Sequence, residues 1–212
     1  MRVPDPHDTN PLPFHPRTAF LKPLVTRSTI SVGDYTYYDD PLGPERFEDH
    51  CVLYHYDFIG DRLEIGRYCA IAANTRFIMN GANHAMDGFS TFPFAIFGGA
   101  WRENYDLAKL GGASRGDTLV GNDVWFGMEA MVMPGVKIGD GAVIGAGAVV
   151  GSDVPPFAVA VGNPARIARM RFDDATITRL LRIAWWNWPV DKVTRNIDAI
   201  TGNDLARLEK AE

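Results

Sequence analysis

The strongest constraint on how this chain folds is a repeat of six residues. From Val120 onward, every sixth residue as far as Val150 is apolar, and five of these six positions are followed by glycine. At the chain's glycine frequency, chance would produce this coincidence with a probability of roughly 10⁻⁴, before the choice of frame is allowed for. The repeat is therefore a structural signal, and its apolar positions are Val120, Phe126, Val132, Ile138, Ile144 and Val150.

An earlier tract carries the same pattern, with apolar residues at Ile59, Ile65, Ile71 and Phe77. Six residues suffice for one short strand and one turn, in which glycine adopts a turn conformation or lets two backbones approach closely. Three such units close a triangular coil, and stacked coils pair as parallel strands about 4.8 Å apart. Val120 would then lie beneath Ile138, and Phe126 beneath Ile144. The period predicts a mainly β protein, a parallel β-helix, and leaves its handedness open.

A break in the repeat separates the two tracts. Phe77 and Val120 lie 43 residues apart, one more than a multiple of six, so the chain must leave the coil between them. We therefore expect an excursion over about residues 80–116. Long loops in compact folds are usually functional or disordered. Its aromatic residues are too many to leave in solvent, which predicts packing on itself or on a neighbouring subunit. They are Phe89, Phe92, Phe94, Phe97, Trp101 and Tyr105.

The two ends of the chain lack the repeat. Residues 1–28, which contain six prolines, are expected to be irregular, and residues 29–172 are expected to form the β-helix domain. Residues 173–212 read as a helical tail, in which Asp173 caps a first helix that Pro189 stops. A second short helix places Val190, Val193, Ile197 and Ile200 on one face. A solenoid exposes unpaired strand edges at its ends, and this tail can cover one of them.

Composition restricts the partners and the compartment. The net charge of −5 provides no general attraction for nucleic acid, so an anionic ligand needs a local basic cluster. Arg166, Arg169 and Arg171 form the best such cluster for a polyphosphate, although a solvated basic edge explains them equally well.

Two cysteines cannot build a disulfide framework or a four-cysteine zinc site. Without an apolar membrane span or signal core we expect no membrane association and a cytoplasmic location.

One histidine is placed where chemistry is plausible. His84 opens the excursion directly after the last regular coil of the first tract, and a loop leaving a rigid wall suits a general base. The plainer interpretation is an ordinary loop histidine. His7 and His15 lie in the proline-rich start, and His50 and His55 would face opposite sides of a strand, which makes a poor metal pair. We expect no bound metal.

Two other features are better explained by packing than by chemistry. Cys69 occupies the small-residue position two before Ile71, which favours a buried side chain over a nucleophile. Any acyl transfer would then proceed by direct attack. The glycine-rich string GDGAVIGAGAVVG has no correctly spaced G-x-G-x-x-G, and the hexapeptide frame explains every glycine in it, so it is not a phosphate loop.

Several motifs together resemble the xenobiotic O-acetyltransferases, which include the streptogramin A (virginiamycin) and type B chloramphenicol acetyltransferases. They are the hexapeptide tract, NGANHAMDG followed by FSTFPF, GNPARIARMRF and AWWNWP. LYHY and VGDYTYYD are closer to the streptogramin enzymes, while Phe89 looks like an extra residue that would alter the acceptor pocket. The resemblance implies a left-handed β-helix, a homotrimer with active sites between adjacent prisms, and acetyl-CoA as co-substrate.

The resemblance also implies roles for individual residues. His84 would be the general base, oriented by Asp87 or by a main-chain carbonyl, since a free imidazole is largely neutral at pH 7. Backbone N–H groups near Trp125 to Gly127 would stabilise the oxyanion. The pantetheine arm would lie against Ala142 and Ala160, and the nucleotide phosphates would face Gly162, Asn163, Pro164 and Arg166. The acceptor would contact Tyr37, Tyr56, Asn83, Phe92 and Phe94.

The favoured hypothesis is therefore transfer of an acetyl group from acetyl-CoA to a hydroxyl of a hydrophobic small molecule such as streptogramin A or chloramphenicol. An acceptor that is a sugar or another endogenous metabolite is the alternative. A γ-type carbonic anhydrase needs three histidines converging on one metal, and only His84 lies in or beside the main repeat region. A non-catalytic β-helix would bind no acetyl-CoA.

Overall fold

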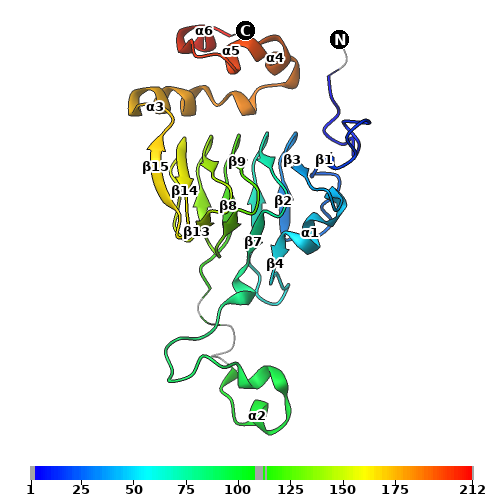
Figure 1. The fold of residues 1–212 in the computed structure, drawn as a ribbon, viewed down its shortest axis with the longest axis vertical. Coiled ribbons are helices and arrows are strands. Elements are labelled where there is room, and N and C mark those ends of the chain that lie inside the picture. Colours follow the sequence, from blue (N-terminus) through cyan, green and yellow to red (C-terminus); the bar gives the residue numbers. More distant parts are fainter. Residues whose placement is uncertain (1–2, 108–111, 113, 212) are drawn as a thin grey trace.

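The computed structural model describes residues 3–107, 112 and 114–211 and shows three β-sheets arranged as the walls of a prism (Figure 1). The first sheet contains β1 (Thr18–Phe20), β3 (Tyr37–Asp39), β6 (Ala70–Ile71), β9 (Trp125–Phe126), β12 (Val143–Ile144), β14 (Ala158–Val161) and β15 (Arg166–Met170). The second contains β4 (Val52–Leu53), β7 (Arg76–Ile78), β10 (Met131–Val132) and β13 (Val149–Val150). The third contains β2 (Ile30–Val32), β5 (Leu63–Ile65), β8 (Thr118–Val120) and β11 (Lys137–Ile138).

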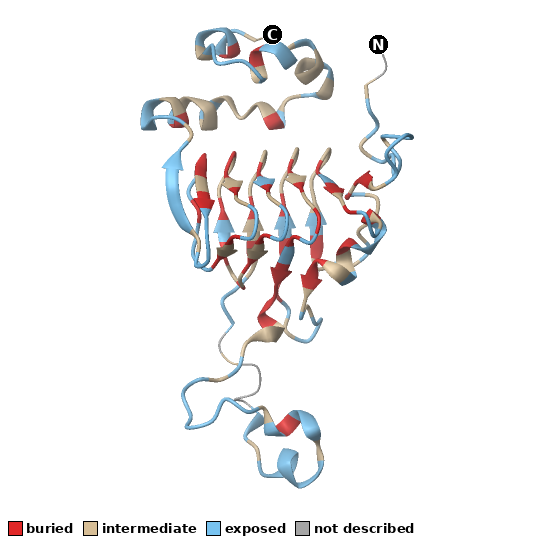
Figure 2. Cartoon of the chain, viewed as in Figure 1, coloured by how far each residue is buried: buried red, intermediate tan, exposed pale blue. Residues whose placement is uncertain are grey.

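The register between coils confirms the six-residue period. Val120 pairs with Ile138 and Phe126 pairs with Ile144, both in parallel. These side chains belong to the buried apolar core of the prism. Figure 2 marks buried residues along the strands of the prism. The glycines of the repeat permit the stacking, because a Cβ added at Gly127 would lie 2.5 Å from the Ala146 nitrogen. Three mostly parallel sheets built from hexapeptides fit a left-handed β-helix.

Between β7 and β8 the chain leaves the prism and returns to it. Strand β7 belongs to the second wall and β8 to the third, which is the wall that follows in the order of winding. The intervening residues form η2 (Asn80–Ala82), at the end of the prism, and then η3 (Phe94–Phe97) and α2 (Gly99–Glu103). Figure 1 shows α2 well away from the prism. Residues 108–111 and 113 of the expected excursion lie outside the described residues. The excursion is thus an insertion into one corner of a coil.

The N-terminal segment is more ordered than the sequence indicated. Strand β1, expected to be irregular chain, pairs antiparallel with β3 and covers that edge of the first wall. Leu21, directly after β1, is fully buried in the core. The corner between β3 and β4 also holds η1 (Pro44–Arg46) and α1 (Phe47–His50), which buries Phe47.

The C-terminal segment contains α3 (Asp174–Ile183), η5 (Trp185–Asn187), α4 (Val190–Arg195), α5 (Ile197–Ile200) and α6 (Leu205–Glu209). The Asp173 carboxylate accepts a hydrogen bond from the Thr176 amide and caps α3. The helix ends at Ala184, in a left-handed conformation with φ of 42°, rather than at the predicted Pro189. In the described part of the chain no helix combines the length and the hydrophobicity that crossing a lipid bilayer requires.

Candidate active site

His84 lies just beyond η2, where the excursion begins, and its imidazole is exposed. Its Nδ1 is 2.8 Å from the main-chain oxygen of Thr91. A carbonyl oxygen can only accept, so Nδ1 must carry the proton, and Nε2 is left with a free lone pair. Of the two orienting groups that the sequence left open, the structure therefore places a main-chain carbonyl on the imidazole, and Asp87 is exposed elsewhere in the same loop.

Two hollows flank this imidazole. The smaller, of about 290 Å³, has a largely apolar wall made by Tyr56, Phe58, Ile59, Pro93 and Ile96, with Tyr105. Tyr56 stacks on Phe58 with ring centroids 5.4 Å apart. The larger, of about 800 Å³, is more open and is lined by Met86, Asp87, Gly112 and Arg115. Both are lined by Asn83, His84, Ala85 and Thr91, so His84 borders both cavities.

The structure brings some of the predicted acceptor contacts together and leaves others apart. Tyr56 and Asn83 line the smaller cavity with His84. Tyr37 lies on β3 in the first wall, away from that cavity's lining. Phe92 and Phe94 pack edge-to-face at 4.7 Å and form a cluster with Phe97 and Trp101. The rings of this cluster contact one another but all four stay exposed, and neither phenylalanine lines a cavity at His84.

The predicted oxyanion donors are already occupied. The amide of Trp125 donates to the Ala142 carbonyl at 3.0 Å, and the amide of Gly127 donates to the Ile144 carbonyl at 2.7 Å. Both bonds belong to the parallel ladder between β9 and β12. Because each backbone N–H is a single donor, these two amides cannot also stabilise an oxyanion while the ladder is intact.

The predicted acetyl-CoA contacts fall into two groups. Ala142 and Ala160 are fully buried inside the prism, so a pantetheine arm on the outside could not touch their side chains. Gly162, Asn163 and Pro164 form the turn between β14 and β15, at the last hairpin of the first wall.

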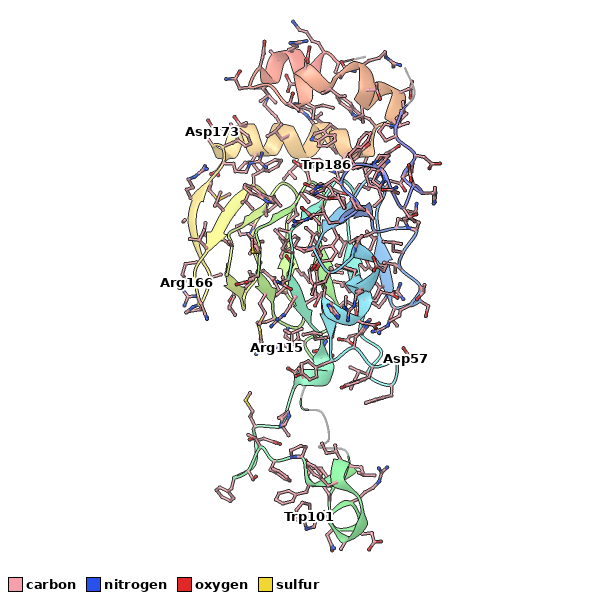
Figure 3. The ribbon with its side chains drawn as sticks, turned by 45° about the vertical axis from the view of Figure 1, so that its right-hand side comes forward. Asp57, Trp101, Arg115, Arg166, Asp173 and Trp186 are labelled. Atoms are coloured by element: carbon pink, nitrogen blue, oxygen red, sulfur yellow. The ribbon has the colours of Figure 1, made fainter. Side chains whose placement is uncertain are left out.

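Arg166 begins β15, and Figure 3 shows it on the outer edge of the hairpin. Its exposed guanidinium donates to the neighbouring carbonyl of Ala165 at 2.8 Å. Arg171, in contrast, is used within the fold, since it donates to the Gly141 carbonyl at 2.6 Å. Neither cavity at His84 includes Arg166 or the turn before it.

The two cysteines are structural. Both are fully buried, and burial raises the pKa of Cys51 to about 11 and that of Cys69 to about 12. A thiol with so high a pKa supplies almost no thiolate at neutral pH, which agrees with the packing role predicted for Cys69. Within the ranges that the structure describes, no group of three potential metal ligands converges.

Sequence reasoning missed part of this site. Phe58, Ile59 and Ile96 were not expected in the wall of the cavity, and only the proximity of Phe58 to Tyr56 could have suggested one of them. Asp61 and Asn80, which are joined by hydrogen bonds where the excursion begins, were also missed. The string NGANH contains Asn80, but its partner sits 19 residues earlier in another corner of the coil.

Comparison with known proteins gives one family model and several relatives. The model of bacterial transferase hexapeptide (six repeats) matches residues 117–152. A virginiamycin A acetyltransferase from Staphylococcus aureus is 46% identical over 207 residues, covering 98% of this chain and 93% of its own. A probable macrolide acetyltransferase from Lysinibacillus sphaericus is 46% identical over 164 residues, covering 77% and 89%.

A chloramphenicol acetyltransferase from Agrobacterium fabrum is 41% identical over 190 residues, covering 89% of this chain and 90% of its own. Among solved structures, a hexapeptide-repeat acetyltransferase from Vibrio cholerae, complexed with acetyl-CoA, is 26% identical with a TM-score of 0.47. That match covers 69% of this chain and 62% of the other.

Proposed function

Because the chain belongs to the hexapeptide-repeat acetyltransferase family that includes the virginiamycin A, chloramphenicol and macrolide acetyltransferases, we propose that it acetylates a hydroxyl of a hydrophobic small molecule. Acetyl-CoA is the donor, and streptogramin A or chloramphenicol represents the class of acceptor. The observation that carries the proposal is the imidazole of His84, which is held by the Thr91 carbonyl beside an apolar cavity.

His84 acts as the general base. Its Nε2 takes the proton from the acceptor hydroxyl while that oxygen attacks the thioester carbonyl carbon, and a tetrahedral oxyanion forms. The intermediate collapses with cleavage of the carbon–sulfur bond, and the proton passes from the imidazolium to the departing thiolate. The Nδ1–H to Thr91 bond favours this role, because it fixes the tautomer and strengthens when the ring becomes positively charged.

The smaller cavity takes the acceptor. Its wall of aromatic and aliphatic side chains favours an apolar molecule over a sugar, whose hydroxyls would lose water without gaining enough partners. Tyr56 and Asn83 supply polar groups that can orient the reacting hydroxyl.

In the proposed enzyme, acetyl-CoA reaches His84 at an interface between subunits. Since the cavities at His84 do not include Arg166 or the Gly162–Pro164 turn of the same chain, we propose a homotrimer in which acetyl-CoA lies between adjacent prisms. The aromatic cluster of the excursion supports this, because Phe97 and Trp101 are more than half exposed on a lobe that stands off the prism (Figure 2). A neighbouring subunit would cover that apolar surface.

A panel of acceptors tests the proposal. Purified protein is incubated with acetyl-CoA and, separately, with streptogramin A, chloramphenicol, a macrolide and simple sugars, and release of free thiol is followed. Both cysteines of the protein are buried, so the released thiol is that of CoA. We expect turnover with at least one of the hydrophobic acceptors. Turnover with sugars alone would contradict the proposed acceptor class. A protein that does not bind acetyl-CoA would contradict the proposed acetyltransferase activity.

A further inference from the structure

A buried polar cluster closes the base of the excursion. Asn80, which follows β7, and Asp61, which precedes β5, are 1% and 3% exposed. The Asp61 Oδ2 accepts hydrogen bonds from the amide and from the side-chain Nδ2 of Asn80, both at 2.8 Å. His55 Nε2 donates to the main-chain carbonyl of Asp61 at 2.9 Å and holds the loop that carries it. We call Asp61, Asn80 and the groups that they bind the base clamp.

The base clamp fastens both limbs of the excursion. On the returning limb, Asn80 Nδ2 donates to the Gly116 carbonyl at 2.8 Å, and its Oδ1 accepts from the Arg115 amide at 2.7 Å. On the departing limb, the same Oδ1 accepts from Asn83 Nδ2 at 3.1 Å. Figure 3 shows Arg115 at the point where the excursion rejoins the prism. One side chain therefore joins the prism, the exit and the return, and the residue after Asn83 is His84.

The two limbs also touch at His84 itself. Gly112, on the returning limb, adopts a φ of +66°, and a Cβ added there would lie 2.7 Å from the His84 carbonyl oxygen. The two segments therefore lie so close that no side chain fits between them, and a shift of the returning limb toward His84 would press on its backbone.

We propose that Asp61 and Asn80 are positioning residues for His84, acting through the limbs of the excursion rather than by contact with substrate. This inference rests on the proposed function. The physical reason is burial: Asp61 Oδ2 and both side-chain polar atoms of Asn80 are hydrogen-bonded in this arrangement, whereas Asp61 Oδ1 has no partner among the described residues. A shift of either residue would therefore break further hydrogen bonds of buried groups. A base must be held close to its productive position, and a displacement of about 1 Å can cost about 10²-fold in rate.

A second corner of the prism provides a matched control. Asp140 Oδ1 accepts from the amide of Asn122 at 2.7 Å and from its Nδ2 at 2.8 Å, and Asn122 Oδ1 accepts from the Arg67 amide at 2.8 Å. The pattern of hydrogen bonds is the same as in the base clamp, but this pair is only partly buried, joins coil to coil and carries no excursion.

The test compares Asn80→Asp with Asn122→Asp. Each change replaces an amide nitrogen that donates by an oxygen that only accepts, and places it against a carboxylate. For Asn80→Asp we expect kcat to fall about 10²-fold while KM for acetyl-CoA stays within about 3-fold of wild type. For Asn122→Asp we expect a lowered Tm with kcat within about 3-fold of wild type.

A conservative variant and a rescue keep the test decisive if Asn80→Asp does not fold. Asp61→Asn keeps the shape of the clamp and removes its charge, and we expect kcat to fall about 5-fold to 10-fold. In the double variant Asp61→Asn with Asn80→Asp, loss of the charge at residue 61 removes the repulsion between two buried carboxylates, and we expect kcat to recover about 10-fold from the Asn80→Asp value.

Each outcome has one meaning. A kcat near wild type in both Asn80→Asp and Asp61→Asn overturns the base clamp and leaves the proposed function intact. Equal losses of kcat in Asn80→Asp and Asn122→Asp also overturn it, since general destabilisation would then explain both. Full activity in His84→Ala instead overturns the assignment of the base, whatever the clamp variants do.

Discussion

The stacking of identical positions in the prism predicts a large cost for removing one core side chain. Ile144 is fully buried on β12, where it pairs with Phe126 of the coil before it and with Ala160 of the coil after it. The change Ile144→Ala removes three carbon atoms from the core and leaves a cavity. The neighbouring coils cannot move to close this cavity, because hydrogen bonds between the strands fix the position of each coil.

The magnitude follows from that burial. At about 0.8 kcal/mol for each buried carbon group, the transfer contribution is about 2.4 kcal/mol, and the cavity left behind brings the loss to about 3–4 kcal/mol. For a chain of this size, the loss corresponds to a fall in Tm of about 10 °C. The matched control is Ile167→Ala on the edge strand β15, where Ile167 is 44% exposed and the expected loss is below about 1 kcal/mol.

Urea unfolding at one fixed protein concentration measures both variants, with circular dichroism as the signal and the slope of the transition as a check on cooperativity. A loss in the free energy of unfolding for Ile144→Ala no greater than that for Ile167→Ala would refute the reasoning. A buried side chain stacked between two coils must cost more to remove than an exposed one on an edge strand.

Three further predictions concern charge and the binding surfaces. Burial raises the pKa of Asp123 to about 6, although the nearby charge of Arg171 lowers it in part. The folded state therefore holds the proton on Asp123 more tightly than the unfolded state does. The free energy of unfolding falls as pH rises from about 4 to about 6. With the side chain still 34% exposed, Asp123→Asn should remove that slope and raise stability at pH 7 by about 1 kcal/mol, and an unchanged slope of Tm against pH would contradict this. Phe58→Ala removes the ring stacked on Tyr56 and should raise KM for the hydrophobic acceptor about 3-fold to 10-fold without changing KM for acetyl-CoA, whereas equal changes in both would place the cavity in donor binding. Arg166→Ala should raise KM for acetyl-CoA about 10-fold or more but leave KM for acetyl-pantetheine, which lacks the nucleotide, as in wild type; a parallel rise for both donors would remove Arg166 from the phosphate site.

The repeat made the walls of the prism predictable, because each coil obeys one local rule and packs only on its neighbours. The register of Val120 with Ile138 could therefore be derived from spacing alone. Strand β1 could not, since residues 18–20 carry no repeat and become a strand only by pairing with the edge at β3. Small residues were ambiguous for a related reason: Ala142 is small because it is buried in a corner, and the sequence does not distinguish this from close approach of a ligand.

The candidate site was predictable at its centre and not in its surroundings. His84 could be found because it sits where the repeat breaks. Its partner could not, because the Thr91 carbonyl is a main-chain atom that any residue would supply. The pairing of Asp61 with Asn80 likewise depends on two corners that meet only after the coil has closed.

The most direct test of the account is kcat for acetyl transfer in His84→Asn and His84→Ala, measured beside acetyl-CoA binding by calorimetry. Asparagine can keep a donor to the Thr91 carbonyl but has no group at the position of Nε2. The account predicts that both variants bind acetyl-CoA as the wild type does and lose at least about 10²-fold in kcat. Turnover near the wild-type value in either variant would contradict the role of this imidazole as the base.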